Sequence, residues 1–183
     1  MNTEDAVALL SGAVPRRTGV WIDFGSGDGT FTRALAELLG SGSTVYAIDR
    51  DPRAIASLAQ SVQVPGVELR PFVADFTYPI RFIGSPLPPI DGMLFANALH
   101  YMSEPELVLG RLVAWLRPGG SVVIVEYDRR AANRWVPYPI GMGRLSEIAT
   151  AAGLSEPSIT ATRPSSYGGD LYVARLNAAL RSS

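Results

Sequence analysis

The sequence predicts an α/β fold of the doubly wound type, in which a mainly parallel sheet carries helices on both faces. Short apolar runs alternate with helical patterns along nearly the whole chain, which is the β–α–β–α rhythm of this class. The runs Met93–Ala96 and Val122–Val125 are continuously apolar, as expected of strands that are buried on both faces. Because the chain has no internal repeat and no long linker, we expect one domain over residues 1–183.

The first half of the chain is predicted to contain two helices and four strands. One helix covers Thr30–Leu39, where apolar residues recur at helical spacing before Gly40. A second runs from Pro52 to about Gln60, since proline suits a first helical turn. The predicted strands are Val20–Phe24, Thr44–Asp49, Val67–Val73 and Ile90–Ala96.

The second half is predicted to add two helices and three strands. In order these are the helix Glu104–Leu116, a turn at Pro118–Gly120, the strand Ser121–Tyr127, the helix Met142–Ala152, and the strands Ser158–Thr162 and Leu171–Leu176. Only a loop rich in Pro, Ser and Gly separates the last two strands, so we expect them to be antiparallel.

Composition excludes several kinds of chemistry. The chain has no Cys and one His, which excludes disulfides, thiolate catalysis and Cys- or His-cluster metal sites. All 16 basic residues are Arg, so lysine Schiff bases and a lysine-containing phosphate loop are also excluded. The net charge of −1 argues against a nucleic-acid partner, which usually requires a dense basic face.

The sequence gives no sign of targeting or of membrane insertion. Glu4 and Asp5 stand where a signal peptide would carry positive charge. Every apolar run is shorter than the roughly 20 residues that a membrane-spanning helix needs. We therefore expect a cytoplasmic protein with no membrane partner.

Three glycines after the first predicted strand form the strongest motif. Gly25, Gly27 and Gly29 alternate with other residues just before a helix, where glycine permits sharp turns and close approach of a ligand. Asp49 ends the neighbouring strand, and the carboxyl ends of such strands meet one crevice. Its carboxylate could accept both hydroxyls of a ribose; the alternative is that it merely ends a strand. Together these residues predict a nucleoside site.

The glycine spacing differs from that of dinucleotide-binding proteins. Their fingerprint, G-x-G-x-x-G, would need a third glycine at the position of Thr30. The pattern here is G-x-G-x-G preceded by Asp23. It resembles the class I S-adenosylmethionine-dependent methyltransferases, and the resemblance extends from about Leu9 to Asn177.

This resemblance implies a Rossmann-like seven-stranded sheet of order 3-2-1-4-5-7-6, with strand seven antiparallel. It also implies S-adenosylmethionine as cofactor and S-adenosylhomocysteine as product. By position, Asp49 would bind the ribose, Arg50 would line the adenine, and Asp75 with the Phe76 N–H would recognise it; the carbonyl of Asn97 would meet the cofactor's ammonium. The implied cofactor-binding residues are Asp23, Gly25, Ser26, Gly27, Gly29, Asp49, Arg50, Asp75, Phe76 and Asn97.

His100 is the candidate catalytic residue. It is the only histidine, it follows the fourth strand, and imidazole suits the removal of a proton from an acceptor hydroxyl or amine near neutral pH. Alternatively, it caps or packs the loop. The candidate acceptor-binding residues, each of which could instead be structural, are Tyr101, Glu126, Arg134 and Tyr138.

The predicted function is therefore methyl transfer to an O or N nucleophile of a small molecule. The motif N-P-P-[YF] is absent after the fourth strand, which argues against transfer to a base or amide nitrogen. About nineteen residues precede the first strand, so we expect a small exposed acceptor site, or one completed by another subunit. The alternatives are a non-catalytic interaction protein, a nucleotide-dependent oxidoreductase and a nucleic-acid methyltransferase.

Overall fold

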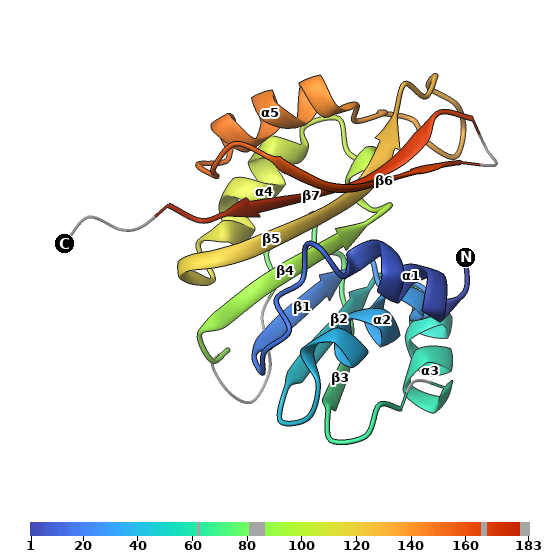
Figure 1. Ribbon diagram of the computed structural model, residues 1–183, viewed down its shortest axis with the longest axis vertical. Helices are drawn as coiled ribbons and strands as arrows, with labels where there is room; N and C mark the ends of the chain where they lie inside the picture. Colours follow the sequence, from blue (N-terminus) through green and yellow to red (C-terminus); the bar gives the residue numbers. More distant parts are fainter. Residues whose placement is uncertain (62, 81–86, 166–167, 180–183) are drawn as a thin grey trace.

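The fold is a seven-stranded sheet between two layers of helices (Figure 1). The computed structural model describes residues 1–61, 63–80, 87–165 and 168–179. Sheet order is β3-β2-β1-β4-β5-β7-β6, and β7 runs antiparallel to both neighbours while β1 to β5 are parallel, which confirms the predicted topology. The strands are β1 Val20–Phe24, β2 Thr44–Asp49, β3 Glu68–Val73, β4 Ile90–Ala96, β5 Leu116–Asp128, β6 Ser158–Pro164 and β7 Asp170–Asn177.

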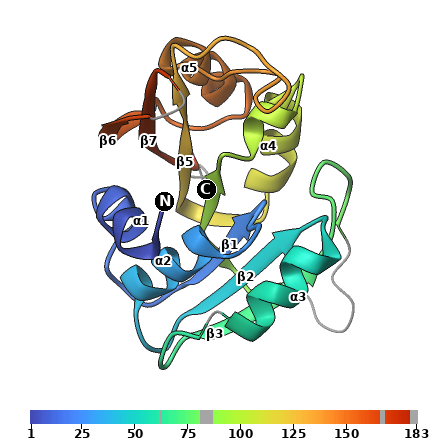
Figure 2. The ribbon, with the colours of Figure 1, turned by 90° about the vertical axis from the view of Figure 1, so that its right-hand side faces the viewer.

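Helices cover both faces of the sheet, with α1 and α2 on the side opposite α4 and α5 (Figure 2). The cluster that includes Leu10 and Leu35 packs α1 and α2 on one face, where Leu58 of α3 also packs. Leu109 of α4 and Ile148 of α5 belong to the core of the other face. The helices are α1 Thr3–Leu10, α2 Thr30–Leu39, α3 Pro52–Ser61, the 3₁₀ turn η1 Leu99–Tyr101, α4 Pro105–Val113 and α5 Met142–Ala151.

Most predicted elements are confirmed, several with identical bounds, but the entry to β5 was predicted wrongly. The helix α4 ends at Val113, and the chain pairs as strand from Leu116 onward rather than turning at Pro118–Gly120. The register shifts between Ile90 and Gly92, which face Leu116 and Ser121. The segment from Leu116 to Ser121 is therefore longer than the segment of β4 that it faces. Gly119 adopts φ +72°, which lets the additional residues of β5 form a bulge.

The helix α1 was not predicted. Its buried face, formed by Ala6, Leu9 and Leu10, packs in the cluster of α2. Asn2 caps its N-terminus by accepting a hydrogen bond from the Asp5 N–H at 2.8 Å. An eight-residue helix has a weak sequence pattern, and its stability comes from the neighbour on which it packs.

Candidate functional site: two adjoining clefts at the carboxyl edge of the sheet

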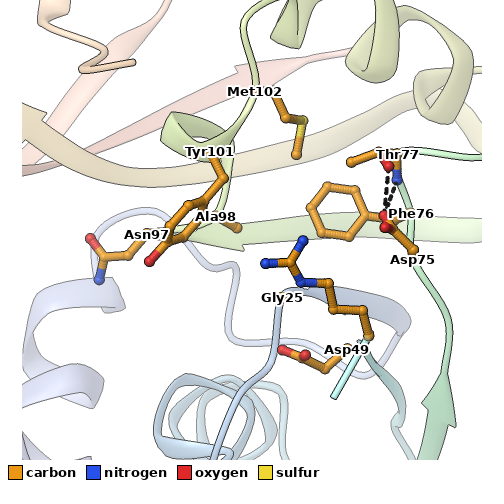
Figure 3. Close-up of a pocket in the computed structure, with 10 residues that line it drawn as sticks. Gly25, Asp49, Asp75, Phe76, Thr77, Asn97, Ala98, Tyr101 and Met102 are labelled. Atoms are coloured by element: carbon orange, nitrogen blue, oxygen red, sulfur yellow. Dashed lines mark hydrogen bonds between the residues drawn. The ribbon is translucent and has the colours of Figure 1, made fainter. Parts of the chain in front are cut away.

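A cleft opens at the carboxyl ends of β1 to β4, where the order of strands reverses between β1 and β4 (Figure 3). Open α/β sheets bind ligands at this switch point because the loops on either side turn to opposite faces. We call it the switch-point cleft. Its lining residues are Gly25, Asp49, Arg50, Asp75, Phe76, Thr77, Asn97, Ala98, Tyr101 and Met102.

The glycine loop follows β1 and is tied to the end of β2. The N–H groups of Gly25 and Ser26 both donate to the Ile48 carbonyl, at 2.8 and 3.1 Å. Gly25 has φ +76°, and an added Cβ would lie 2.9 Å from the Ala98 Cβ. Gly27 has φ +52°, but a Cβ there would meet nothing within 4 Å. Backbone conformation therefore favours glycine at both positions, and packing requires it at the first alone.

Asp49 joins the glycine loop to the start of α3. Its Oδ2 accepts a hydrogen bond from the Gly27 N–H at 2.8 Å, and its Oδ1 accepts one from the Asp51 N–H at 2.9 Å. These two backbone donors hold the half-buried carboxylate at the mouth of the cleft. A carboxylate has about four acceptor positions, so it can accept further donors from a ligand. Asp49 thus combines a structural and a potential binding role.

Asp75 and Phe76 form another wall of the cleft. The Asp75 Oδ1 accepts hydrogen bonds from both the N–H and the hydroxyl of Thr77, at 2.9 and 2.6 Å, which closes a tight turn after β3 (Figure 3). The buried Phe76 ring packs 5.3 Å from that of Phe24. Arg111 of α4 donates to the Phe76 carbonyl at 2.7 Å, so the turn is tied to the helical layer as well.

Four predicted cofactor residues, Asp23, Ser26, Gly27 and Gly29, are not among the lining residues of the cleft, and the side chains of Asp23 and Ser26 are buried. Asp23 accepts a 2.6 Å hydrogen bond from the Thr32 hydroxyl through Oδ2. Among the described residues, its Oδ1 and the Ser26 Oγ are buried without a hydrogen-bond partner. Burial raises the pKa of Asp23 to about 7, against the opposing effect of the Thr32 hydrogen bond; the charge of Asp49 adds to the rise.

Asn97 directly follows β4 in a left-handed conformation with φ +53°, which asparagine tolerates better than most residues. Its N–H donates to the Val125 carbonyl at 2.9 Å, and this bond fixes the turn against β5. Its Oδ1 is buried and has no partner within the described part of the chain. Such an orphaned acceptor at a cleft is the expected feature of a site that receives a donor from a ligand.

His100 is held by a buried carboxylate. Its Nδ1 lies 2.7 Å from the Glu126 Oε2, and both side chains are almost entirely inaccessible to solvent. The Glu126 Oε1 accepts the N–H groups of Leu99 and His100, both at 3.2 Å. The carboxylate therefore faces three donors and orients the imidazole, in the same way that buried acids orient catalytic histidines elsewhere.

A second cleft adjoins the first and is lined in part by His100. The two clefts share Asn97 and Tyr101, so Tyr101 stands between them with a half-exposed side chain. We call this second space the histidine cleft. Its lining residues are Asn97, His100, Tyr101, Tyr127, Arg130, Trp135 and Val136.

The predicted acceptor residues fall in different places. Glu126 is fully buried behind His100. Its side chain therefore does not face the cleft, as a residue that binds the methyl acceptor would. Arg134 lies over the Trp135 ring at 5.3 Å and is outside the lining of the histidine cleft, while Tyr138 lines a third depression beside Tyr101. Arg130 lines the histidine cleft and was missed, because three arginines stand close together in a loop whose course the sequence does not define.

Two features are absent from the residues that the structure describes. None of their helices combines the length and apolar character that a membrane span requires. Their His, Asp and Glu side chains form no group of three or more that could hold a metal ion.

Comparison with known proteins identifies the family. A family model described as "Methyltransferase domain" matches residues 22–122, which include the glycine loop, Asp49, the turn at Asp75 and His100. This match covers more than half of the chain. The protein therefore belongs to the methyltransferase-domain family.

Curated relatives match parts of the chain. Trans-aconitate 2-methyltransferase from Delftia acidovorans is 30% identical over 130 residues, which are 70% of this chain and 46% of the relative. Ribosomal RNA small subunit methyltransferase H from Paracidovorax citrulli is 45% identical over 53 residues, 29% of this chain and 17% of the relative. The chain thus spans less than half the length of these relatives.

A solved structure, described as a SAM-dependent methyltransferase from Aquifex aeolicus, shares the fold. Its TM-score is 0.66 at 17% identity, and the match covers 97% of this chain and 98% of that one. The likeness therefore extends over the complete sheet, including the antiparallel β7.

Proposed function

We propose that the protein binds S-adenosylmethionine in the switch-point cleft and transfers its methyl group to a small molecule in the histidine cleft. The observation that carries this proposal is the adjacency of the two clefts, which share Asn97 and Tyr101. A methyl donor and an acceptor must meet across such a shared boundary. Membership of the methyltransferase-domain family makes this donor the expected one.

The residues of the switch-point cleft fit such a group. Gly27 does not line this cleft, but it belongs to the same glycine loop as Gly25, and a Cβ there would meet nothing within 4 Å. Asp49 has acceptor capacity for the ribose hydroxyls, and Asp75 and Phe76 form the wall at which an adenine would lie. The buried Asn97 Oδ1, without a partner among the described residues, could accept a donor from the amino-acid part. Arg50 also lines this cleft.

When bound, the cofactor supplies a methyl group already activated by a sulfonium. The protein must then hold an acceptor, exclude water and, where the acceptor carries a proton, remove it. Glu126 would hold the neutral imidazole of His100 with its proton on Nδ1, so that Nε2 has the lone pair of a general base. Glu126 is then a residue that positions His100, and it does not itself contact the methyl acceptor.

A small-molecule acceptor is better supported than a nucleic acid. The net charge is −1, and one relative bears the name of an enzyme acting on trans-aconitate, a small organic anion. The relative named for ribosomal RNA matches only 53 residues. A non-catalytic interaction protein would have no need of a buried carboxylate to orient His100 at the border of a cleft.

Calorimetric titration with S-adenosylmethionine and S-adenosylhomocysteine, with NAD as control, tests the cofactor. We expect S-adenosylmethionine and S-adenosylhomocysteine to bind and NAD not to bind. Asp49→Ala should weaken their binding about ten-fold or more, because buried ribose hydroxyls lose an ionised acceptor. Asp51→Ala is the matched control, since this exposed acid lies outside the lining of the cleft. Binding of NAD alone would replace the proposal with an oxidoreductase.

Glu126→Gln tests the role of His100. The glutamine amide would turn a donor toward Nδ1 and favour the opposite tautomer, in which Nε2 carries the proton. We expect kcat to fall by about 10² to 10⁴ with unchanged cofactor affinity. An unchanged kcat would show that His100 is structural.

A further inference from the structure

Exposed apolar side chains gather at the edge of the sheet that carries the clefts. Among the described residues, eight large apolar side chains are exposed, and six of them lie at the carboxyl ends of β3, β4 and β5 or in the segments that follow. These six are Val73, Tyr78, Tyr101, Leu107, Trp135 and Tyr138. Such a concentration marks a surface that receives an apolar ligand or partner. The inference drawn from it rests on the proposed function, since the ligand would be the methyl acceptor.

Tyr101 connects the histidine cleft to the third depression. Its half-exposed side chain lines both of these spaces, as well as the switch-point cleft. The centroid of its ring lies 4.4 Å from that of the His100 ring. The Tyr138 N–H donates to the His100 carbonyl at 3.0 Å, which holds the third depression beside the histidine. A molecule that leaves the histidine cleft across Tyr101 therefore enters the third depression.

The third depression is lined mainly by apolar side chains. These are Tyr101, Met102, Leu107, Val108 and Tyr138. Leu107 is 64% exposed, although it lies on the same helix as the buried Val108. Arg111 also lines the depression, but its guanidinium donates to the carbonyls of Phe76 and Tyr78, at 2.7 and 3.3 Å. An apolar chain placed here would cover Leu107 without requiring a new polar partner.

The rim of the histidine cleft presents a fixed aromatic ring. Asn133 and Val136 exchange backbone hydrogen bonds of 3.1 and 3.2 Å, and the Asn133 side chain accepts the Trp135 backbone N–H at 2.8 Å. Val136 is buried and anchors this turn. Trp135 lines the cleft and is nevertheless 68% exposed. Together with Tyr101 it offers a flat ligand two rings on which to pack.

The histidine cleft favours an uncharged group. The Arg130 guanidinium lies over the Tyr127 ring, 4.4 Å from its centroid, so this cation is engaged with the protein. The described lining contains no carboxylate, and both oxygens of the buried Glu126 are engaged by His100 and by backbone donors. A phenol is uncharged at neutral pH, with a pKa of about 10 as in tyrosine. Its proton is within reach of a histidine base, whereas an aliphatic alcohol is far less acidic.

We propose that the methyl acceptor is an uncharged phenol that carries an apolar tail. Its ring would lie against Tyr101 and Trp135 with the hydroxyl toward His100. Its tail would cross Tyr101 and lie against Leu107 and Tyr138 in the third depression. In the transfer, the phenol oxygen loses its proton to the His100 Nε2 and gains the methyl group, while the electron pair of the broken carbon–sulfur bond stays on sulfur. Leu107 then determines specificity for the tail, and Trp135 determines it for the ring.

Phenols of increasing chain length test the tail. The protein, saturated with S-adenosylhomocysteine, is titrated with 4-methyl-, 4-ethyl-, 4-butyl- and 4-hexylphenol at concentrations below their aggregation. Each added methylene that becomes buried should tighten binding by about two- to four-fold. Leu107→Gln should weaken the binding of the butyl and hexyl compounds by about five-fold or more, because the chain loses an apolar contact. The same substitution should leave the binding of 4-methylphenol unchanged.

Trp135→Ala tests the ring. It should weaken every member of the series by a similar factor, about three- to ten-fold, and keep the gain per methylene. Ile159→Gln is the matched control for Leu107→Gln. Ile159 is an exposed apolar residue of β6 and lines none of the three spaces, so its variant should bind the whole series like the wild type. Circular dichroism verifies the fold of each variant, and methyl-labelled S-adenosylmethionine measures transfer to the tightest phenol.

Several results would overturn the inference. An absence of phenol binding, or an affinity that does not change with chain length, would remove the tail from acceptor recognition. A gain with chain length that survives Leu107→Gln would place the tail elsewhere. Tight binding without transfer of the label would make the phenol a ligand but not an acceptor. A wild-type dimer in sedimentation velocity that Leu107→Gln dissociates would assign the apolar surface to a second copy of the chain.

Failure of the proposed function would be seen separately. A wild-type protein that binds neither S-adenosylmethionine nor S-adenosylhomocysteine would overturn the proposed function in the cofactor titration, before any phenol is added. Normal binding of both, with no phenol bound, would overturn only the inference about the acceptor.

Discussion

Asp23 shows how one buried residue can make stability depend on pH. The side chain is 1% exposed and its pKa is raised to about 7 by burial. In the unfolded chain an aspartate titrates near 3.8, so the unfolded state loses its proton first as the pH rises. The folded state is therefore destabilised progressively between about pH 4 and pH 7, and the penalty is constant above that range.

Asp23→Asn should remove this dependence. Asparagine keeps the shape and can still accept the Thr32 hydroxyl, but it has no charge to bury. We expect the variant to gain stability over the wild type as the pH rises from 4 to 7, by up to about 4 kcal/mol at 1.36 kcal/mol per unit. Urea denaturation at pH 4.5, 6 and 8 without ligand measures the difference. A gap that did not widen with pH would contradict it.

Asp28→Asn serves as the control for this comparison. Asp28 is an exposed carboxylate of the same loop, and its Oδ1 accepts the Thr30 N–H at 3.2 Å. The substitution removes the same charge without changing a buried group. Its effect on stability should therefore be small at each pH.

At the scale of elements, glycine occurs in the glycine loop for two different reasons, backbone conformation and close packing. Gly25 and Gly27 both adopt positive φ, which costs most other L-residues about 1–2 kcal/mol. Only at Gly25 would a Cβ also collide with the protein, at Ala98. At Gly27 a Cβ would enter open space, so within the protein only the backbone conformation favours glycine there.

Gly27→Ala should thus affect binding far more than folding. We expect a loss of about 1–2 kcal/mol in the free energy of unfolding, but S-adenosylhomocysteine affinity should fall about ten-fold or more through obstruction. Gly25→Ala should destabilise the fold more strongly. Gly40→Ala is the control, since Gly40 has φ +75° with nothing within 4 Å and lies at the end of α2 opposite to the glycine loop. Calorimetry and denaturation separate the two effects.

At the scale of the whole molecule, the site depends on strand order. The carboxyl ends of β1, β2 and β3 carry Gly25, Asp49 and Asp75, while β4 and β5 bring Asn97 and Glu126. A ligand at the boundary would contact elements from both halves of the sheet. Its binding should therefore stabilise the complete fold rather than a single loop.

Thermal denaturation measures this coupling. At 100 times its dissociation constant, a ligand specific for the folded state adds about 2.7 kcal/mol. For a chain of this size we expect S-adenosylhomocysteine to raise Tm by roughly 5–10 °C in one cooperative transition. NAD at the same concentration should leave Tm unchanged. An equal shift with NAD would contradict the assignment of the cleft.

Much of the architecture could be predicted from the sequence. The bounds of β1, α2, β2 and β4 were predicted correctly, because continuous apolar runs, helical spacing and the flanking glycines are local signals. The glycine loop and Asp49 were likewise placed at one edge, since the ends of neighbouring parallel strands must meet there. These features depend on residues close in sequence and on a general rule of parallel sheets.

Tertiary structure alone decided how the chemical groups are paired. Glu126 meets His100 from 26 residues away, because β5 lies beside β4 in a register that turns Glu126 inward. The same packing buries Asp23 against α2 and selects Arg130 rather than Arg134 for the histidine cleft. The direction in which a side chain points depends on the register of its strand or on the path of its loop. Both are determined by long-range contacts that a local pattern does not contain.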